Sequence, residues 1–142
     1  MASIRSGIGE NMEDRYLFKA KRVDNGEWVT GSLLTCEDGT CKIATSLLEV
    51  KTNGPILVCA YDVDRDTICQ CTGLKDKNGN LIWENDIVKI NNSKANTVVA
   101  FRDFEIICTI PNEKYYKHRL EYDTEYEVIG NIFDNGERFI GK

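Results

Sequence analysis

Short apolar or alternating stretches recur along the chain and are separated by Asn-Gly and Asp-Gly pairs, a pattern typical of antiparallel hairpins. Residues 16–23 and 27–34 flank an Asp-Asn-Gly sequence at residues 24–26. Asn and Gly readily adopt the positive φ that a tight hairpin turn requires. We therefore predict that these two stretches form a hairpin.

Further strands are expected wherever the apolar stretches recur, at residues 56–61, 68–72, 87–90, 97–101, 106–110 and 126–133. Pro111 ends one of them, because proline has no N–H to donate to a ladder. Only residues 113–120 have a helix-like pattern, long enough for one or two turns. Turn signals spaced by roughly 8–12 residues favour an all-β fold.

The domain organisation follows from where these patterns begin and change. Residues 1–12 show no periodicity and are expected to be a disordered tail. Residues 13–70 form a region of β-hairpins, and residues 71–142 form a small barrel that packs with the first region as one unit. The predicted core of the small barrel at residues 71–142 is Leu74, Ile82, Trp83, Ile87, Val88, Ile90, Val98, Val99, Phe101, Ile107, Val128, Ile129, Ile132 and Phe133.

Composition and charge narrow the functional classes. Hydrophobic residues make up 42% and charged residues 29% of the 142 residues, which is an ordinary globular composition. The net charge of −5 argues against direct binding to nucleic-acid phosphates. The chain has no signal-peptide pattern and no apolar stretch of membrane-spanning length, so we expect a cytoplasmic protein with reduced thiols.

One segment, residues 72–88, carries a recognisable signature, and a second, residues 128–135, carries a closing motif. Together with residues 16–20, 28–31 and 63–67 they resemble the YopX family, small proteins encoded by phages and prophages of bacteria. The resemblance implies an all-β fold of antiparallel hairpins with a C-terminal SH3-like small barrel, and it implies no activity. The motif residues that we expect to be structural are Thr72, Gly73, Asp76, Asn78, Gly79, Trp83, Asp86, Gly130 and Asn131.

Three positions depart from that family pattern. Asn85 stands where the family usually has Gly, and Asn also enters the left-handed region at low cost, so we expect the turn to survive. Cys71 replaces a frequent aromatic residue and is expected to fill the core. Gly136 replaces a usual Pro, which should loosen the end of the chain.

The candidate catalytic and metal-binding patterns have structural explanations that fit the sequence better. The only histidine, His118, lies in a charged segment where surface solvation explains it better than a Cys-His dyad. Alternating acids at residues 62–66 lack the Gly and terminal Glu of a calcium loop. The chain is therefore predicted to be non-enzymatic, with no metal and no cofactor. A zinc site is disfavoured because Cys36, Cys41, Cys69 and Cys71 lack the spacing of zinc knuckles.

Two features are candidates for binding. Residues 121–128 alternate, and in a strand they would place acids on one face every ~6.6–6.8 Å, close to the rise over two phosphates of one DNA strand. Such a face could mimic nucleic acid, or it could simply protect an edge strand. Tyr115 and Tyr116, between lysines, are the candidate partner-binding aromatics. The acidic residues of the candidate face are Glu121, Asp123, Glu125 and Glu127.

The resulting hypothesis is a phage or prophage accessory protein that works as a non-enzymatic binding module for a host or phage protein. A homo-oligomer is compatible with this hypothesis. The alternative is a counter-defence protein that sequesters a small nucleotide signal or mimics nucleic acid through the acidic face.

Overall fold

A computed structural model describes residues 14–45 and 59–140. The tail predicted at residues 1–12 and most of the strand predicted at residues 56–61 lie outside them. Contacts between residues divide the chain into two compact units: one is Tyr16–Gln70, and the other contains Cys71–Lys142. The expected packing of the two regions as one body remains a prediction.

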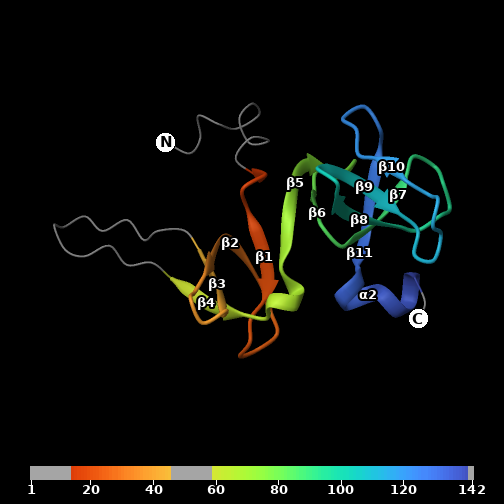
Figure 1. Ribbon diagram of the computed structural model, residues 1–142. Coiled ribbons are helices and arrows are strands. Elements are labelled where there is room, and N and C mark those ends of the chain that lie inside the picture. The colour runs from red at the N-terminus through yellow and green to blue at the C-terminus, as the bar shows by residue number, and fades with distance from the viewer. Residues whose placement is uncertain (1–13, 46–58, 141–142) are drawn as a thin grey trace, which may run out of the picture. The chain divides into compact units, whose positions relative to one another are not determined.

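The Tyr16–Gln70 unit is an antiparallel sheet in which β4, β3, β2 and β1 are consecutive neighbours (Figure 1). The Asp-Asn-Gly hairpin is confirmed, because β1 pairs with β2 around that turn and Phe18 lies opposite Gly31. On its other side, β1 pairs with the first two residues of β5 (Cys69–Lys75), which are Cys69 and Gln70. The elements of this unit are β1 (Phe18–Lys21), β2 (Trp28–Thr35), β3 (Cys41–Ala44), β4 (Ala60–Val63) and the 3₁₀ turn η2 (Arg65–Thr67).

The core of this unit is small and made from one face of the sheet. Ala20, Cys41, Ile43 and Val63 are buried and form one cluster. Gly31 in β2 is required by this packing, because a Cβ there would lie 2.0 Å from the carbonyl oxygen of Ala44.

The C-terminal unit contains a second antiparallel sheet of five strands in the order β10-β9-β8-β7-β11 (Figure 1). The hairpin of β5 and β6 belongs to this unit from Cys71 onward. Its elements are β5 (Cys69–Lys75), β6 (Leu81–Trp83), β7 (Asp86–Ile90), β8 (Thr97–Arg102), β9 (Glu105–Thr109), β10 (His118–Arg119), β11 (Tyr126–Asn131) and the helix α2 (Ile132–Phe139).

These strands confirm the all-β class but not a closed barrel. Within residues 59–140, β10 and β11 each pair with a sheet neighbour on one side only. The SH3-like barrel is therefore not confirmed at the level of strand pairing.

The core of the C-terminal unit contains half of the fourteen residues that the sequence predicts. Six others are only half-buried: Leu74, Val98, Phe101, Val128, Ile129 and Phe133. Ile82, Trp83, Ile87, Val88, Ile90, Val99 and Ile107 are all buried, as expected. Cys71 is 1% exposed, which confirms that it fills the core. Cys108 and Tyr126 are also buried, although they were not on the predicted list.

The helix α2, near the C-terminus, lies elsewhere than predicted. Residues 113–120 form turns and β10, whereas α2 begins at Ile132, inside the predicted strand 126–133. Asn131 ends that strand because its side-chain Oδ1 accepts hydrogen bonds from the N–H groups of Phe133 and Asp134, both at 2.9 Å. Ile132 was consequently placed wrongly in the core, and its side chain is 36% exposed.

Candidate binding surface

The first half of the family-like signature is a turn organised by one buried carboxylate. Asp76 is 7% exposed, and its Oδ1 accepts hydrogen bonds from the N–H groups of Asn78 and Asn80, both at 2.9 Å. Gly79 completes the turn with a φ of 85°. The turn predicted at residues 76–80 is thus confirmed, and its motif residues have a structural role.

Asp76 also holds a strand that is distant in the sequence. Its Oδ2 accepts a hydrogen bond of 3.0 Å from the N–H of Val128 in β11, and the Lys77 N–H donates to the carbonyl oxygen of Tyr126 at 2.8 Å. Burial raises the pKa of Asp76, but the N–H donors of Val128, Asn80 and Asn78 outweigh burial, so its pKa lies below the ordinary value. These bonds occupy backbone groups at the free edge of β11.

The second half of the signature fixes the bend between β6 and β7. The Trp83 N–H donates to Oδ2 of Asp86 at 2.8 Å, and Asp86 is 3% exposed. Asn85 has a φ of 72°, as expected for a residue that replaces glycine. Before this bend, the Thr72 hydroxyl donates to the carbonyl oxygen of Ile82 at 2.7 Å, and Gly73 has a φ of 83°.

The closing motif serves the junction of β11 and α2. A Cβ at Gly130 would lie 2.5 Å from Oδ1 of Asn135, and that same oxygen accepts a hydrogen bond from the Asn131 N–H at 3.1 Å. Gly130 and Asn131 are therefore explained by the start of the helix and need no ligand.

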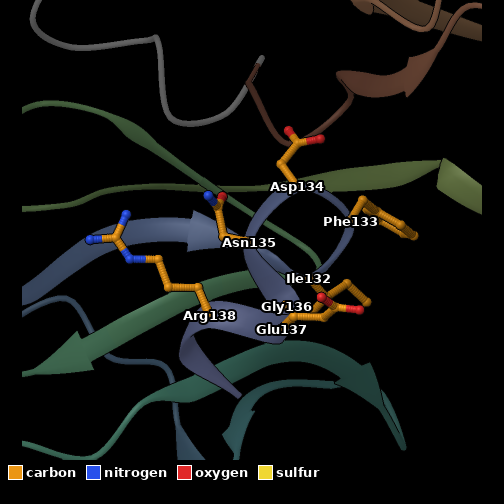
Figure 2. Close-up of a pocket in the computed structure, with 7 residues that line it drawn as sticks. All are labelled: Ile132, Phe133, Asp134, Asn135, Gly136, Glu137 and Arg138. Atoms are coloured by element: carbon orange, nitrogen blue, oxygen red, sulfur yellow. The ribbon is translucent and has the colours of Figure 1, made fainter. Parts of the chain in front are cut away.

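Helix α2 borders a hollow of about 750 Å³ whose described lining is residues 132–138. Figure 2 shows the side chains spread around the helix, with Asn135 and Arg138 on one side and Phe133 and Glu137 on the other. Asn135 is already engaged by the backbone of Asn131, and the lining shows no group of polar side chains converging on one point. This hollow does not define a ligand.

The cysteine thiols do not assemble a reactive or metal-binding centre in the described residues. Across residues 14–45 and 59–140, no three His, Cys, Asp or Glu side chains are grouped so that they could hold a metal ion. Burial raises the pKa of the Cys108 thiol to about 11, so it is protonated at neutral pH and is not a thiolate nucleophile.

His118 is not simply a solvated surface residue, as the sequence suggested. It is half-buried in β10, and its Nε2 lies 3.0 Å from the hydroxyl oxygen of Tyr126. That oxygen also accepts a hydrogen bond of 2.9 Å from the Glu121 N–H. Cys108 lies opposite His118 in the ladder but is fully buried, so the pair offers no nucleophile to a substrate.

The prediction of an acidic strand face at residues 121–128 is wrong for residues 121–125. The described strand begins at Tyr126, and residues 122–124 form a turn. The turn closes on the Tyr126 hydroxyl and on Asn91, whose side chain accepts a hydrogen bond from the Glu125 N–H at 3.2 Å. The exposed acids Glu121, Asp123 and Glu125 therefore do not repeat along one strand face with Glu127.

An unusual feature of the C-terminal unit is the turn between β8 and β9. Asp103 and Phe104 are the only residues between the paired Arg102 and Glu105, and their φ angles are 51° and 67°. Glycine normally occupies the second position of such a turn, because a bulky residue at positive φ costs about 1–2 kcal/mol. Phe104 is 110% exposed, so no packing in the described chain compensates for that cost.

A pocket of about 350 Å³ includes Arg102, the residue before this turn, in its lining, whereas Phe104 does not line it. Arg102 at the end of β8 contributes to its wall, and the segment after β9 contributes Lys114 and Tyr116. Tyr115 is 89% exposed and Tyr116 is 37% exposed. We call Arg102, Phe104, Lys114, Tyr115 and Tyr116 the 102–116 surface. The pocket is lined by Arg102, Thr109, Ile110, Pro111, Asn112, Glu113, Lys114 and Tyr116.

The sequence identified only part of this surface. Tyr115 and Tyr116 were predicted as exposed aromatics, and the structure places both at the surface. Arg102 and Phe104 were missed. The available signal was the four-residue gap, residues 102–105, between the strands predicted at 97–101 and 106–110, in which Asp-Phe stands where Asn-Gly or Asp-Gly is usual.

In residues 14–45 and 59–140, these features define a mostly β protein with antiparallel sheets and a short C-terminal helix, and the residues of the sequence signature stabilise its turns. The model of the YopX protein family matches residues 17–139 of the 142-residue chain, and the chain belongs to this family. No curated protein matches the chain. In the described part of the chain, no helix is long and apolar enough to cross a membrane.

Proposed function

We propose that the protein is a non-enzymatic binding module, an accessory protein of phage or prophage origin that binds a host or phage protein in the cytoplasm. The observation that carries this proposal is Phe104, which is fully exposed at a positive φ. A residue that strains the backbone and buries nothing does not stabilise the fold. Such a residue is explained when another molecule covers it.

The exposed side chains of the 102–116 surface suit a protein partner. Tyr and Arg are enriched at the centres of protein interfaces, where they combine apolar area with hydrogen bonding. Arg102 and Tyr116 in the pocket lining, and the exposed Tyr115, supply these groups in the same unit as Phe104. Because the motif residues of the signature are used within the fold, the 102–116 surface is the better candidate than the turn at Asp76.

The test uses Phe104→Gly, because glycine relieves the strain at φ 67° while it removes the aromatic ring. We expect the variant to be as stable as the wild type or more so. In capture from infected or lysogenic cells, quantified by mass spectrometry, it should lose a protein that the wild type retains.

Tyr122→Ser is the matched control, since Tyr122 is 79% exposed in the same unit but outside the 102–116 surface. The control should retain the captured protein. Capture of the same proteins by wild type and Phe104→Gly would refute the proposal.

The C-terminal unit is proposed to be a partly open SH3-like barrel. This is supported by the contact between the Tyr126 hydroxyl in β11 and His118 in β10, because these strands are the two edges of the five-stranded sheet. The arrangement needed for nucleic-acid mimicry is missing, because the acids at residues 121–125 lie in and beside a turn and do not form a strand face.

A further inference from the structure

We infer that the pocket of the 102–116 surface receives a single carboxylate side chain, an Asp or Glu, from the bound protein. This inference rests on the proposed function and specifies the chemistry of the contact. It begins from the charges that line the pocket, Arg102, Lys114 and Glu113.

The cations on this side of the sheet differ in their partners. Glu105 binds both Lys117, at 3.1 Å, and Arg119, at 3.0 Å, and those two cations lower its pKa. Arg102 and Lys114, in contrast, have no ion pair with any of the described residues, and Lys114 only lies near the ring of Tyr115, at 5.6 Å. The pocket therefore contains two cations that the described fold leaves without a carboxylate.

The net charge of the pocket determines how many negative charges the expected ligand carries. With Glu113 also in the lining, the pocket has a net charge of +1 from two cations and one carboxylate, in a chain whose net charge is −5. One carboxylate would neutralise it, whereas a polyanion such as nucleic acid would meet the repulsion of the rest of the chain.

The remaining lining fits a peptide better than a free ion. Ile110 and Pro111 are apolar, and Tyr116 adds an aromatic wall. Arginine binds carboxylates through two parallel N–H donors, and the half-buried Ile110 and Pro111 offer apolar surface to the residues that flank the carboxylate. An acidic side chain flanked by apolar residues combines both requirements.

The first test is NMR titration of the full-length ¹⁵N-labelled protein with three probes. Ac-Leu-Glu-Leu-NH₂ should give saturable shifts at the amides of Asn112, Lys114 and Tyr116, and Ac-Leu-Gln-Leu-NH₂ should not. Inorganic phosphate is the third probe, and it should bind more weakly than the Glu peptide. Saturable shifts of equal size with the Gln peptide, or with phosphate alone, would overturn the inference.

The second test uses substitutions in the pocket and outside it. Arg102→Gln and Lys114→Gln should each weaken binding of the Glu peptide by about tenfold, the loss of one charge-assisted contact. Lys94→Gln and Arg65→Gln remove exposed cations outside the pocket and should leave binding unchanged. Equal binding by Arg102→Gln and wild type would contradict the inference.

The same variants separate this inference from the proposed function. If Phe104→Gly loses the captured protein but Arg102→Gln and Lys114→Gln retain it, the surface binds a partner and the carboxylate inference fails. If Phe104→Gly retains every captured protein, the proposed function fails, whatever the peptides do.

Discussion

Substitution of Asp76 by Asn tests the structural role of the signature. The carboxylate accepts three backbone hydrogen bonds, two at Oδ1 and one, from Val128, at Oδ2. Asn can keep the first two but presents an NH₂ group to the Val128 N–H. A hydrogen bond to a charged group contributes about 1.5–3 kcal/mol net, so Asp76→Asn should lower the free energy of unfolding by about 2 kcal/mol.

The assay is urea denaturation followed by the fluorescence of Trp83, which is 8% exposed in the native C-terminal unit. A Trp28→Phe background makes Trp83 the only tryptophan. Asp38→Asn is the matched control: Asp38 also accepts from turn donors, at 3.0 and 2.7 Å from Thr40, but it is exposed and uses one oxygen for both. Because Asp38 lies in the Tyr16–Gln70 unit, the unfolding of the control is followed by circular dichroism, which reports both units, and it should cost less than about 0.5 kcal/mol.

The difference in the free energy of unfolding between wild type and Asp76→Asn should also depend on pH. Because the pKa of Asp76 is lowered in the folded state, its stabilisation is fully present above the unfolded pKa of about 3.9 and is lost as the pH falls through the lower folded value. The gap between wild type and Asp76→Asn should therefore be largest at pH 7 and narrow towards pH 3. Equal effects of Asp76→Asn and Asp38→Asn at pH 7 would refute the reasoning.

Three further predictions follow from single contacts. Gly31→Ala should destabilise the N-terminal unit by at least about 2 kcal/mol, because the added methyl collides with a backbone carbonyl, and circular dichroism on heating would show an unchanged melting curve if this is wrong. Tyr126→Phe should cost about 1–2 kcal/mol in urea denaturation by leaving the Glu121 N–H without its acceptor, and an unchanged midpoint would contradict it. The Cys108 thiol, fully buried with a pKa of about 11, should react with Ellman's reagent at pH 8 far more slowly than Cys36, measured in single-cysteine variants; similar rates would contradict the described burial.

The sequence predicted the parts of the fold that depend on local chemistry. The Asp-Asn-Gly turn at residues 24–26 and the turn at residues 76–80 were found because Asn, Asp and Gly have specific backbone preferences. The strand before Pro111 was found because its residues are β-branched or apolar. The C-terminal core followed from the same pattern.

The failures concern contacts between distant residues or competition between two structures. Residues 121–125 alternate like a strand, but the Tyr126 hydroxyl and Asn91 hold them as a turn. Residues 132–133 are apolar like the end of a strand, but Asn131 caps a helix there. Of the binding surface, the tyrosines were identifiable from their composition, whereas Arg102 joins them only through the folded pocket.

The bond between Asp76 and Val128 also has a consequence for the folding kinetics. It joins residues 52 positions apart, whereas the bonds of Asp76 to Asn78 and Asn80 are local and can form as soon as the turn does. Closing so long a loop is entropically costly and is expected late in folding. The carboxylate should then influence mainly the rate at which the native protein opens, and so the lifetime of the folded molecule in the cell.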